Sequence, residues 1–416
     1  MRRGAGDWKP GEFPRRREAE RIAKDTLPTE PGRELAILVA VELSDGARLW
    51  SLDDTLNELD YLVRTAGAKV VGRVSQRSRR LTPTYVGKGK VQEINDSVAQ
   101  HGADVVIFDD ELTPSQQRNL EDALGIKVID RTALILDVFG RHARSYEGKL
   151  QVELAQHRYL LPRLAGQWSH LERLGGGIGT RGPGESQIET DRRLVRRRIQ
   201  RIEQELEGVR RRRILYMGRR KKSSIPIASL VGYTNAGKST LFNSLSDAKV
   251  ETADQLFSTL DPVTRKVRLP SGGDLLLTDT VGFIQKLSPT VVAAFRATLE
   301  ELAESDILLH VIDVTHPKAA EQIEVVEAIL ADLGLAERPR LQVANKMDLL
   351  LPAGNGPDAS GFASRSLDAG GAVFVSAAKG WNLDQLLQKI EHKLMSLDGP
   401  LTVATSADPL KAPVRE

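Results

Sequence analysis

Short apolar runs alternate with amphipathic stretches over residues 34–130. The runs are rich in β-branched residues, which predicts strands, and the stretches between them have helical periodicity. The runs are ELAILVAVEL, AKVVGRVS, ADVVIFD and IKVID, and the helical stretches lie near 51–65, 90–101 and 113–124. Because alternating strands and helices form parallel sheets, this region predicts an α/β domain.

Between Lys149 and Leu215 the pattern becomes helical in two segments. Apolar positions recur at spacings of four and three residues, which predicts one apolar seam on each helix. The seams are Leu150, Leu154, His157 and Leu161, then Val195, Ile199, Ile202, Leu206 and Val209. The intervening RLGGGIGTRGPGES is too rich in glycine to be helical, and SQIE at 186–189 forms a capping box that restarts the helix. Because each seam needs a partner, we expect an antiparallel helical hairpin with a flexible tip.

A second region of alternating strands and helices follows Pro226. The chain is therefore predicted to be of the α/β class, with two α/β domains, of which the second has a mostly parallel sheet, joined by the hairpin. The predicted segments are a disordered basic tail at 1–32, an N-terminal α/β domain at 33–148, the hairpin at 149–222, the second α/β domain at 223–397 and a polar tail at 398–416.

Composition narrows the class of protein. The 416 residues include no cysteine, so disulfides, thiolate zinc sites and a cysteine nucleophile are excluded. No apolar run approaches the roughly 18 residues that span a bilayer, and the first residues lack the apolar segment of a secretory signal. We expect a soluble, cytoplasmic protein.

Positive charge is unevenly distributed. The formal net charge is only +3, but arginine is concentrated between Asp191 and Lys222. Such a local field favours polyphosphate partners such as RNA. A solvated helix face explains the charge alone equally well.

Three further patterns are weak evidence for a metal or cofactor site. GKGK at 87–90 is more typical of a turn that opens a helix than of a phosphate-binding loop. The acidic residues 109–111 are more typical of a solvated loop than of a metal site. Gly177, Gly179 and Gly182 match G-x-G-x-x-G, but a dinucleotide site requires a preceding strand and HLERL is helical in character. A loop that approaches phosphate or base through Arg173 and Arg181 is the better functional interpretation, with a plain hinge as its alternative.

Residues 232–239, GYTNAGKS, match the P-loop pattern between a strand-like IPIASLV and a helix-like TLFNSL. Backbone N–H groups of this loop attract phosphates, Lys238 reaches the β and γ groups, and Ser239 offers a hydroxyl to Mg²⁺. Asp279 ends a later strand, where a carboxylate can hold Mg²⁺ through water, and the backbone N–H of Gly282 can meet the γ-phosphate.

Further along, LQVANKMD and VFVSAAKG supply a base pocket. A carboxylate at Asp348 pairs with the N1–H and exocyclic amine of guanine, which adenine lacks, so the pocket selects guanine. Four motifs in this order predict a guanine-nucleotide-binding P-loop domain. The predicted nucleotide-binding residues are Gly232, Tyr233, Thr234, Asn235, Ala236, Gly237, Lys238, Ser239, Thr240, Asp279, Gly282, Asn345, Lys346, Asp348, Ser376, Ala377 and Ala378.

These motifs resemble those of P-loop GTPases of the translation-factor type. The resemblance implies that Thr259, in FSTLDPVTR, closes over Mg²⁺ and the γ-phosphate, with Thr264 as a nearby competitor. It implies Ser239, Thr259 and Asp279 as the metal site, and Lys238, Thr259 and Gly282 as the catalytic residues.

Longer stretches resemble the HflX family of ribosome-associated GTPases. They include YVGKGKVQEI, FDDELTPSQQRNLE, GGGIGTRGPGESQIETDRR and DTVGFI, and together they span residues 35–397. The resemblance implies GTP hydrolysis and a monomer that binds the large ribosomal subunit, splits or rescues ribosomes, and can associate peripherally with a membrane. It also implies that the first domain and the hairpin contact ribosomal RNA, for which the candidates are Arg173, Arg181, Arg192, Arg193 and Arg197.

Phe283 stands where many GTPases have a glutamine that orients the attacking water. Because phenylalanine has no polar group, intrinsic hydrolysis should be slow, and a backbone group, a cation or a partner surface must complete the site. Asn235 occupies the position at which some related GTPases coordinate K⁺, so K⁺ is a candidate cofactor beside Mg²⁺.

Two other functions compete with ribosome binding. The protein could be a switch that acts on a protein effector, or an ATP-driven RNA remodeller. Asp348 and the lack of a second P-loop motif disfavour the remodeller, although some use of ATP stays open.

Overall fold

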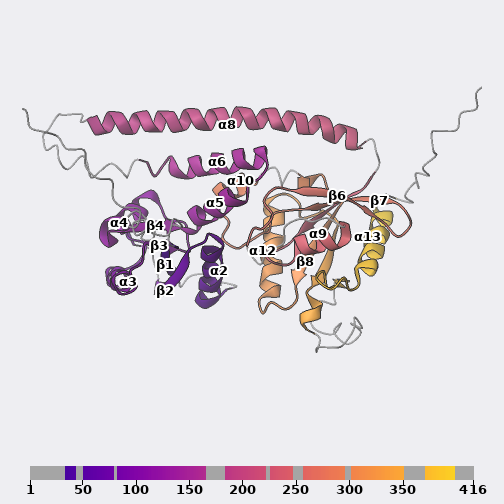
Figure 1. Ribbon diagram of the computed structural model, residues 1–416, viewed down its shortest axis with the longest axis horizontal. Helices are drawn as coiled ribbons and strands as arrows, with labels where there is room; N and C mark the ends of the chain where they lie inside the picture. The colour runs from indigo at the N-terminus through magenta and orange to yellow at the C-terminus, as the bar shows by residue number, and fades with distance from the viewer. Residues whose placement is uncertain are drawn as a thin grey trace, which may run out of the picture.

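The computed structural model describes residues 33–43, 50–78, 82–164, 183–221, 225–246, 256–295, 301–350 and 371–398, without the side chains of 43, 183–188, 213–221 and 398. Two α/β units lie side by side beneath one long helix (Figure 1). This architecture confirms the predicted α/β class. Residues 1–32 and 399–416 of the predicted tails and residues 173–182 of the predicted glycine-rich tip lie outside the described residues. The end of the tip differs from the prediction: α8 (Pro183–Lys221) already begins at Pro183, so SQIE at 186–189 lies inside the helix and does not start it.

The first unit is a four-stranded parallel sheet in the order β2-β1-β3-β4. Its strands are β1 (Leu35–Leu43), β2 (Lys69–Ser78), β3 (Val105–Phe108) and β4 (Lys127–Asp130). Side chains of β1 alternate between two apolar cores. Leu38 lies in the core with α2 (Leu52–Thr65) and α5 (Arg131–His142), and Val39 lies in the core with α3 (Lys88–His101) and α4 (Pro114–Leu124).

Local capping sets where these helices begin. Ser51 and Asp54 form a capping box at the start of α2, and Thr113 and Gln116 form another at the start of α4. Gly87 is the N-cap residue of α3, so GKGK is the turn that opens a helix, as predicted.

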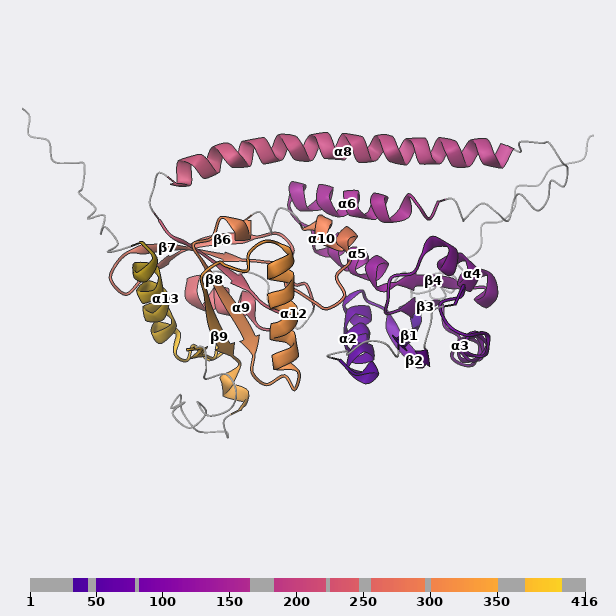
Figure 2. The same ribbon diagram turned by 180° about the vertical axis from the view of Figure 1, so that it is seen from behind.

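The hairpin pairs α6 (Tyr146–Leu160) with α8 (Pro183–Lys221), which run antiparallel in both views (Figures 1 and 2). Leu150, Leu154 and Ile202 form the buried seam, flanked by Ile199 and Leu206. Tyr146 donates a hydrogen bond to Glu205 (2.6 Å), and Arg198 pairs with Glu153 (2.7 Å). The 4-3 periodicity therefore identified the centre of the seam, whereas the predicted positions His157, Leu161, Val195 and Val209 lie outside this cluster.

The second unit is a six-stranded sheet in the order β10-β9-β8-β5-β7-β6, in which only the β6–β7 pair is antiparallel. Its strands are β5 (Ile227–Val231), β6 (Val263–Arg268), β7 (Asp274–Asp279), β8 (Ile307–Asp313), β9 (Arg340–Asn345) and β10 (Val373–Phe374). Its helices are α9 (Lys238–Ser246), α10 (Pro289–Ala294), α12 (Ala319–Asp332) and α13 (Leu383–Asp398), with the 3-10 turn η1 (Met347–Leu349).

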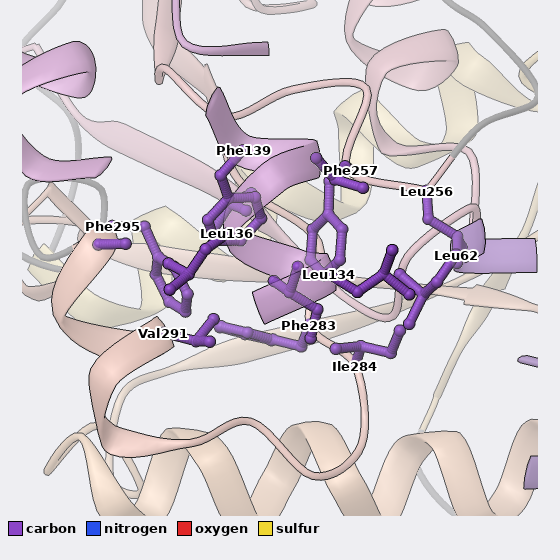
Figure 3. Close-up of a cluster of buried hydrophobic side chains, with 14 of the residues drawn as sticks. Leu62, Leu134, Leu136, Phe139, Leu256, Phe257, Phe283, Ile284, Val291 and Phe295 are labelled. Atoms are coloured by element: carbon purple, nitrogen blue, oxygen red, sulfur yellow. The ribbon is translucent and has the colours of Figure 1, made fainter. Parts of the chain in front are cut away.

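One apolar core joins the two units (Figure 3). We call it the shared core; it contains Leu62, Leu134, Leu136 and Phe139 from the first unit and Leu256, Phe257, Phe283, Ile284, Val291 and Phe295 from the second. The ring of Phe139 meets those of Phe257 and Phe295 edge to face, with centroids 4.8 and 5.9 Å apart. Phe283 is fully buried there.

Buried charges cross the same boundary. Arg131 pairs with Glu58 and with Asp109 (2.7 Å), and Lys286 pairs with Asp109 and Asp110. Burial alone would lower the pKa of Arg131, but Glu58 and Asp109 raise it above its usual value. The expectation of a solvated loop at Asp109 is wrong: its side chain is fully buried because two cations neutralise it.

Candidate nucleotide site

The P-loop connects the end of β5 to the start of α9. Asn235 has φ 61° and Gly237 has φ 90°, both in the left-handed region. A Cβ on Gly237 would lie 2.3 Å from Asn345 Nδ2, so only glycine fits there. This close approach brings the strand that carries the base-pocket motif against the phosphate loop.

Lys238 lies inside the loop and is 6% exposed. Its Nζ donates to the carbonyl oxygens of Gly232 (3.1 Å) and Tyr233 (2.8 Å). Burial lowers the pKa of Lys238 to about 8, although Asp279 opposes the shift. The loop therefore encloses an ammonium group that a phosphate would stabilise.

Three oxygen-bearing side chains meet next to this lysine. Ser239 Oγ and Thr259 Oγ1 donate to Asp279 Oδ2 at 2.7 and 2.9 Å, and the two hydroxyls are 2.8 Å apart. Asp279 Oδ1 is buried without a hydrogen-bond partner, and burial raises the pKa of this carboxyl. An all-oxygen set with an unsatisfied carboxylate atom suits Mg²⁺, which prefers oxygen ligands at octahedral spacing.

Thr264, the competitor of Thr259, lies elsewhere. It is on β6, and its hydroxyl is 3.0 Å from that of Thr278 on β7. Thr259 is the threonine that the fold brings to Ser239 and Asp279.

Gly282 packs directly on the P-loop. A Cβ there would be 2.9 Å from Thr234 Cα and 3.0 Å from Lys238 Nζ. The next peptide is held as well, because Thr234 N donates to Phe283 O (2.7 Å) and Phe283 N donates to Gly232 O (3.0 Å). A cavity of about 40 Å³ lies between this segment, the P-loop and Thr259.

The base-pocket residues are held by hydrogen bonds to one another. Asn345 Nδ2 donates to Ala236 O (2.9 Å), and Ala377 N donates to Asn345 Oδ1 (3.0 Å). Ser376 Oγ donates to Asp348 Oδ1 (2.7 Å), and Lys346 Nζ donates to Asp313 (2.7 Å). Three motifs separated in sequence thus meet at the carboxyl ends of β5, β9 and β10.

The RNA-contact candidates on α8 differ in exposure. Arg193 and Arg197 are exposed, whereas Arg192 is half-buried and its Nε has no hydrogen-bond partner. Arg173 and Arg181 lie outside the described residues. Among the described residues, no cluster of histidine, aspartate and glutamate could hold a metal, and no helix is long and apolar enough to cross a membrane.

Sequence reasoning missed the contacts of Tyr233. Its hydroxyl donates to Glu58 on α2 and accepts from Gln285 N (3.0 Å), and burial raises its pKa well above the usual value. Tyr233 therefore bridges the P-loop, the segment after Gly282 and the first unit. In the sequence, the one indication of these contacts is the presence of an aromatic residue inside the P-loop.

Three sequence profiles match, described as GTP-binding GTPase N-terminal (residues 53–140), GTP-binding GTPase Middle Region (142–220) and 50S ribosome-binding GTPase (227–346). A GTP-binding protein of Sulfolobus solfataricus in complex with GDP is similar in structure, with a TM-score of 0.43 and 27% identity, over 88% of this chain and 99% of that one.

Curated relatives named GTPase HflX match most of the chain. The protein of Caldanaerobacter subterraneus subsp. tengcongensis is 50% identical over 90% of this chain and 82% of its own length. That of Escherichia coli K12 is 45% identical over 87% of this chain and 83% of its own length. At these identities over nearly the whole length, the chain belongs to the HflX family of GTPases.

Proposed function

We propose that this protein binds and hydrolyses GTP with Mg²⁺ and associates with the large ribosomal subunit, where it splits or rescues ribosomes and where hydrolysis is stimulated. The proposal rests on the positions of the two segments that would contact the γ-phosphate, those of Thr259 and Gly282. Thr259 and Gly282 adjoin the phosphate loop, while their neighbours Phe257 and Phe283 lie in the shared core. A change at the phosphate therefore has a direct route to the first unit and the hairpin.

The nucleotide would be held at both ends. Lys238 and the backbone N–H groups of residues 234–239 would bind the phosphates, and Asp348 would select the base. Asn345, Ser376 and Ala377 position the pocket through the hydrogen bonds described above.

Mg²⁺ would be held by Ser239 and Thr259, with Asp279 acting through water. When bound, the ion supplies charge neutralisation for the phosphates. Thr259 would exchange its bond to Asp279 for the ion, which orders the 256–260 segment.

At residue 283 the isolated protein has no side chain that can orient the attacking water. Phe283 is fully buried in the shared core, so neither its chemistry nor its position allows it to orient water. A ribosomal surface would complete the site. K⁺ held by Asn235 beside the phosphates is a second contributor, and equal rates in sodium and potassium would argue against it.

The hairpin would supply RNA contacts. Arg193 and Arg197 are exposed on α8, away from the buried seam at Ile202. GTP would order the two switch segments and hold the hairpin against ribosomal RNA, and hydrolysis would release it.

The decisive experiment measures GTP turnover with and without purified large subunits. Slow turnover alone and strong stimulation by the subunits are expected. Fast turnover that ignores added subunits would remove the basis of the proposal.

A second experiment tests the RNA contacts. Arg193→Glu with Arg197→Glu should reduce co-sedimentation with large subunits roughly tenfold or more at low salt, because each phosphate contact contributes through counterion release. The matched control reverses two exposed arginines of β6, Arg265→Glu with Arg268→Glu, and should bind normally. Equal loss in both pairs would mean a nonspecific charge effect, and the hairpin would then serve as a spacer for a protein effector.

A further inference from the structure

A cavity of about 330 Å³ lies between the first unit and the P-loop, distinct from the small phosphate cavity. Its walls come from α2, from the start of α12 and from residues 233–235, and α2 faces α12 in both views (Figures 1 and 2). Thr234 and Asn235 line both cavities. An occupant of the larger cavity would therefore reach the phosphates of bound GTP.

The chemistry of the walls indicates a cation. Asp54, Glu58 and Asp313 line the cavity, and its described lining includes no lysine or arginine. Their cationic partners, such as Lys346 for Asp313, stand outside it. A phosphate, and therefore an RNA backbone, would meet three carboxylates, against which His316 is the one basic side chain of the described lining.

The aromatic residues of the lining also favour a cationic occupant. Trp50, Tyr61 and Tyr233 line the cavity, and the rings of Trp50 and Tyr233 are stacked with centroids 6.0 Å apart. Faces of aromatic rings attract guanidinium and ammonium groups.

Two buried polar atoms of the lining have no partner: Trp50 Nε1 and Thr234 Oγ1, in side chains that are 8% and 6% exposed. Such atoms are costly to bury unless something bonds to them. The threonine oxygen can accept from a guanidinium, whereas the indole N–H needs an acceptor such as a peptide carbonyl. A polypeptide segment that carries arginine offers both groups; a metal ion or a simple amine offers only one.

We propose that this cavity is the entry site for an arginine side chain of a partner protein, which would place its guanidinium beside Thr234 and the phosphates. The inference rests on the proposed function, in which an external surface completes hydrolysis. A guanidinium in that position stabilises the charge that develops on the phosphates during transfer. The guanidinium would supply a polar group at the site of hydrolysis, which the buried Phe283 cannot do.

The test compares two charge reversals on one helical turn. Asp54→Lys changes a carboxylate that lines the cavity, and Asp53→Lys changes its exposed neighbour in the same first turn of α2. Single-turnover GTP hydrolysis is measured with saturating large subunits and without them. We expect Asp54→Lys to lower the stimulated rate tenfold or more, Asp53→Lys to change it less than twofold, and both to keep the unstimulated rate.

Trp50→Phe provides a second variant, because it keeps one aromatic ring while it removes the N–H together with part of the indole. It should lower the stimulated rate about threefold without changing GDP affinity. Thermal unfolding of all three variants identifies any loss of fold, which matters most for Asp54, because it forms the capping box of α2 with Ser51.

The outcomes separate the two ideas. If large subunits do not stimulate the unchanged protein, the proposed function fails and this inference fails with it. If they do stimulate it, but Asp54→Lys and Trp50→Phe behave like Asp53→Lys, only the cavity assignment is overturned. A higher stimulated rate in Asp54→Lys would mean that an anion such as RNA enters the cavity, which also overturns the assignment.

Discussion

Hydrogen bonds fix the side chains of two residues of the nucleotide site. Lys238 donates hydrogen bonds to two backbone carbonyl oxygens, and Asp348 accepts a hydrogen bond from Ser376. For the proposed nucleotide contacts, both side chains would therefore need little reordering, which lowers the entropy cost of association.

The first prediction concerns pH and Lys238. Its pKa of about 8 in the folded protein means that it carries its charge below pH 8 and loses it above. Because phosphates bind the charged form, GDP affinity should be constant from pH 6.5 to 7.5 and then fall by up to about tenfold per pH unit. Fluorescence titration with a labelled GDP measures this. Lys238→Arg stays charged throughout and serves as the control, since the titration of guanine itself is common to both proteins.

The second prediction concerns Asp348. Asp348→Asn replaces an acceptor pair with an amide, so the preference for GTP over ATP should fall by roughly two orders of magnitude. Xanthosine triphosphate, which carries a carbonyl in place of the guanine amine, should gain affinity in the variant. Competition binding measures all three nucleotides, and an undiminished preference for GTP would show that Asp348 does not contact the base.

At the scale of elements, the segment after Gly282 is held between the P-loop and α5. Phe283 donates and accepts backbone hydrogen bonds with the P-loop while its ring lies in the shared core near Leu134 and Ile284 (Figure 3). The phenylalanine that is unsuited to catalysis is thus an apolar anchor between units.

The third prediction follows from that burial. Phe283→Gln should destabilise the protein by about 3 kcal/mol or more, because it leaves a gap and a buried amide, and it should not raise intrinsic GTP turnover. Phe283→Leu keeps the apolar contact and should cost less. Urea unfolding and turnover without ribosomes measure both; a faster glutamine variant of normal stability would mean that this side chain does face the phosphates.

At the scale of the whole molecule, the two α/β units behave as one packed body across the shared core and the buried charges. Glu58 is central, because it accepts from both Arg131 and Tyr233. Removing one partner from such a network leaves an uncompensated buried charge.

The fourth prediction tests this network. Glu58→Ala should lower stability by about 3–5 kcal/mol and accelerate amide hydrogen exchange at residues 283–286. Glu42→Ala removes a surface pair with Arg77 within the first unit and should cost no more than about 1 kcal/mol. Similar behaviour of the two variants would show that the charges do not hold the units together.

Much of this structure follows from local patterns. The sequence predicted the strands of the first sheet, the P-loop between β5 and α9, and β5, β7, β9 and β10 of the second sheet, because these depend on neighbouring residues. It did not predict β6 and β8, and it placed helices near Ser51 and Thr113 without the capping boxes that start them. The hairpin partners followed from the 4-3 seam. The sequence did not predict where the hairpin begins. Helix α6 starts at Tyr146 because Ser145 caps it, three residues before the predicted start.

The sequence by itself determined the α/β class, the order of the nucleotide motifs and the absence of a polar side chain at residue 283, because each is written in contiguous residues. Only the tertiary structure decided that Thr259 and not Thr264 meets Ser239, that Asp109 is a buried ion-pair partner, and that Phe283 joins two units. These depend on contacts between residues tens to hundreds of positions apart, and burial, charge pairing and cavity shape exist only once those residues have come together.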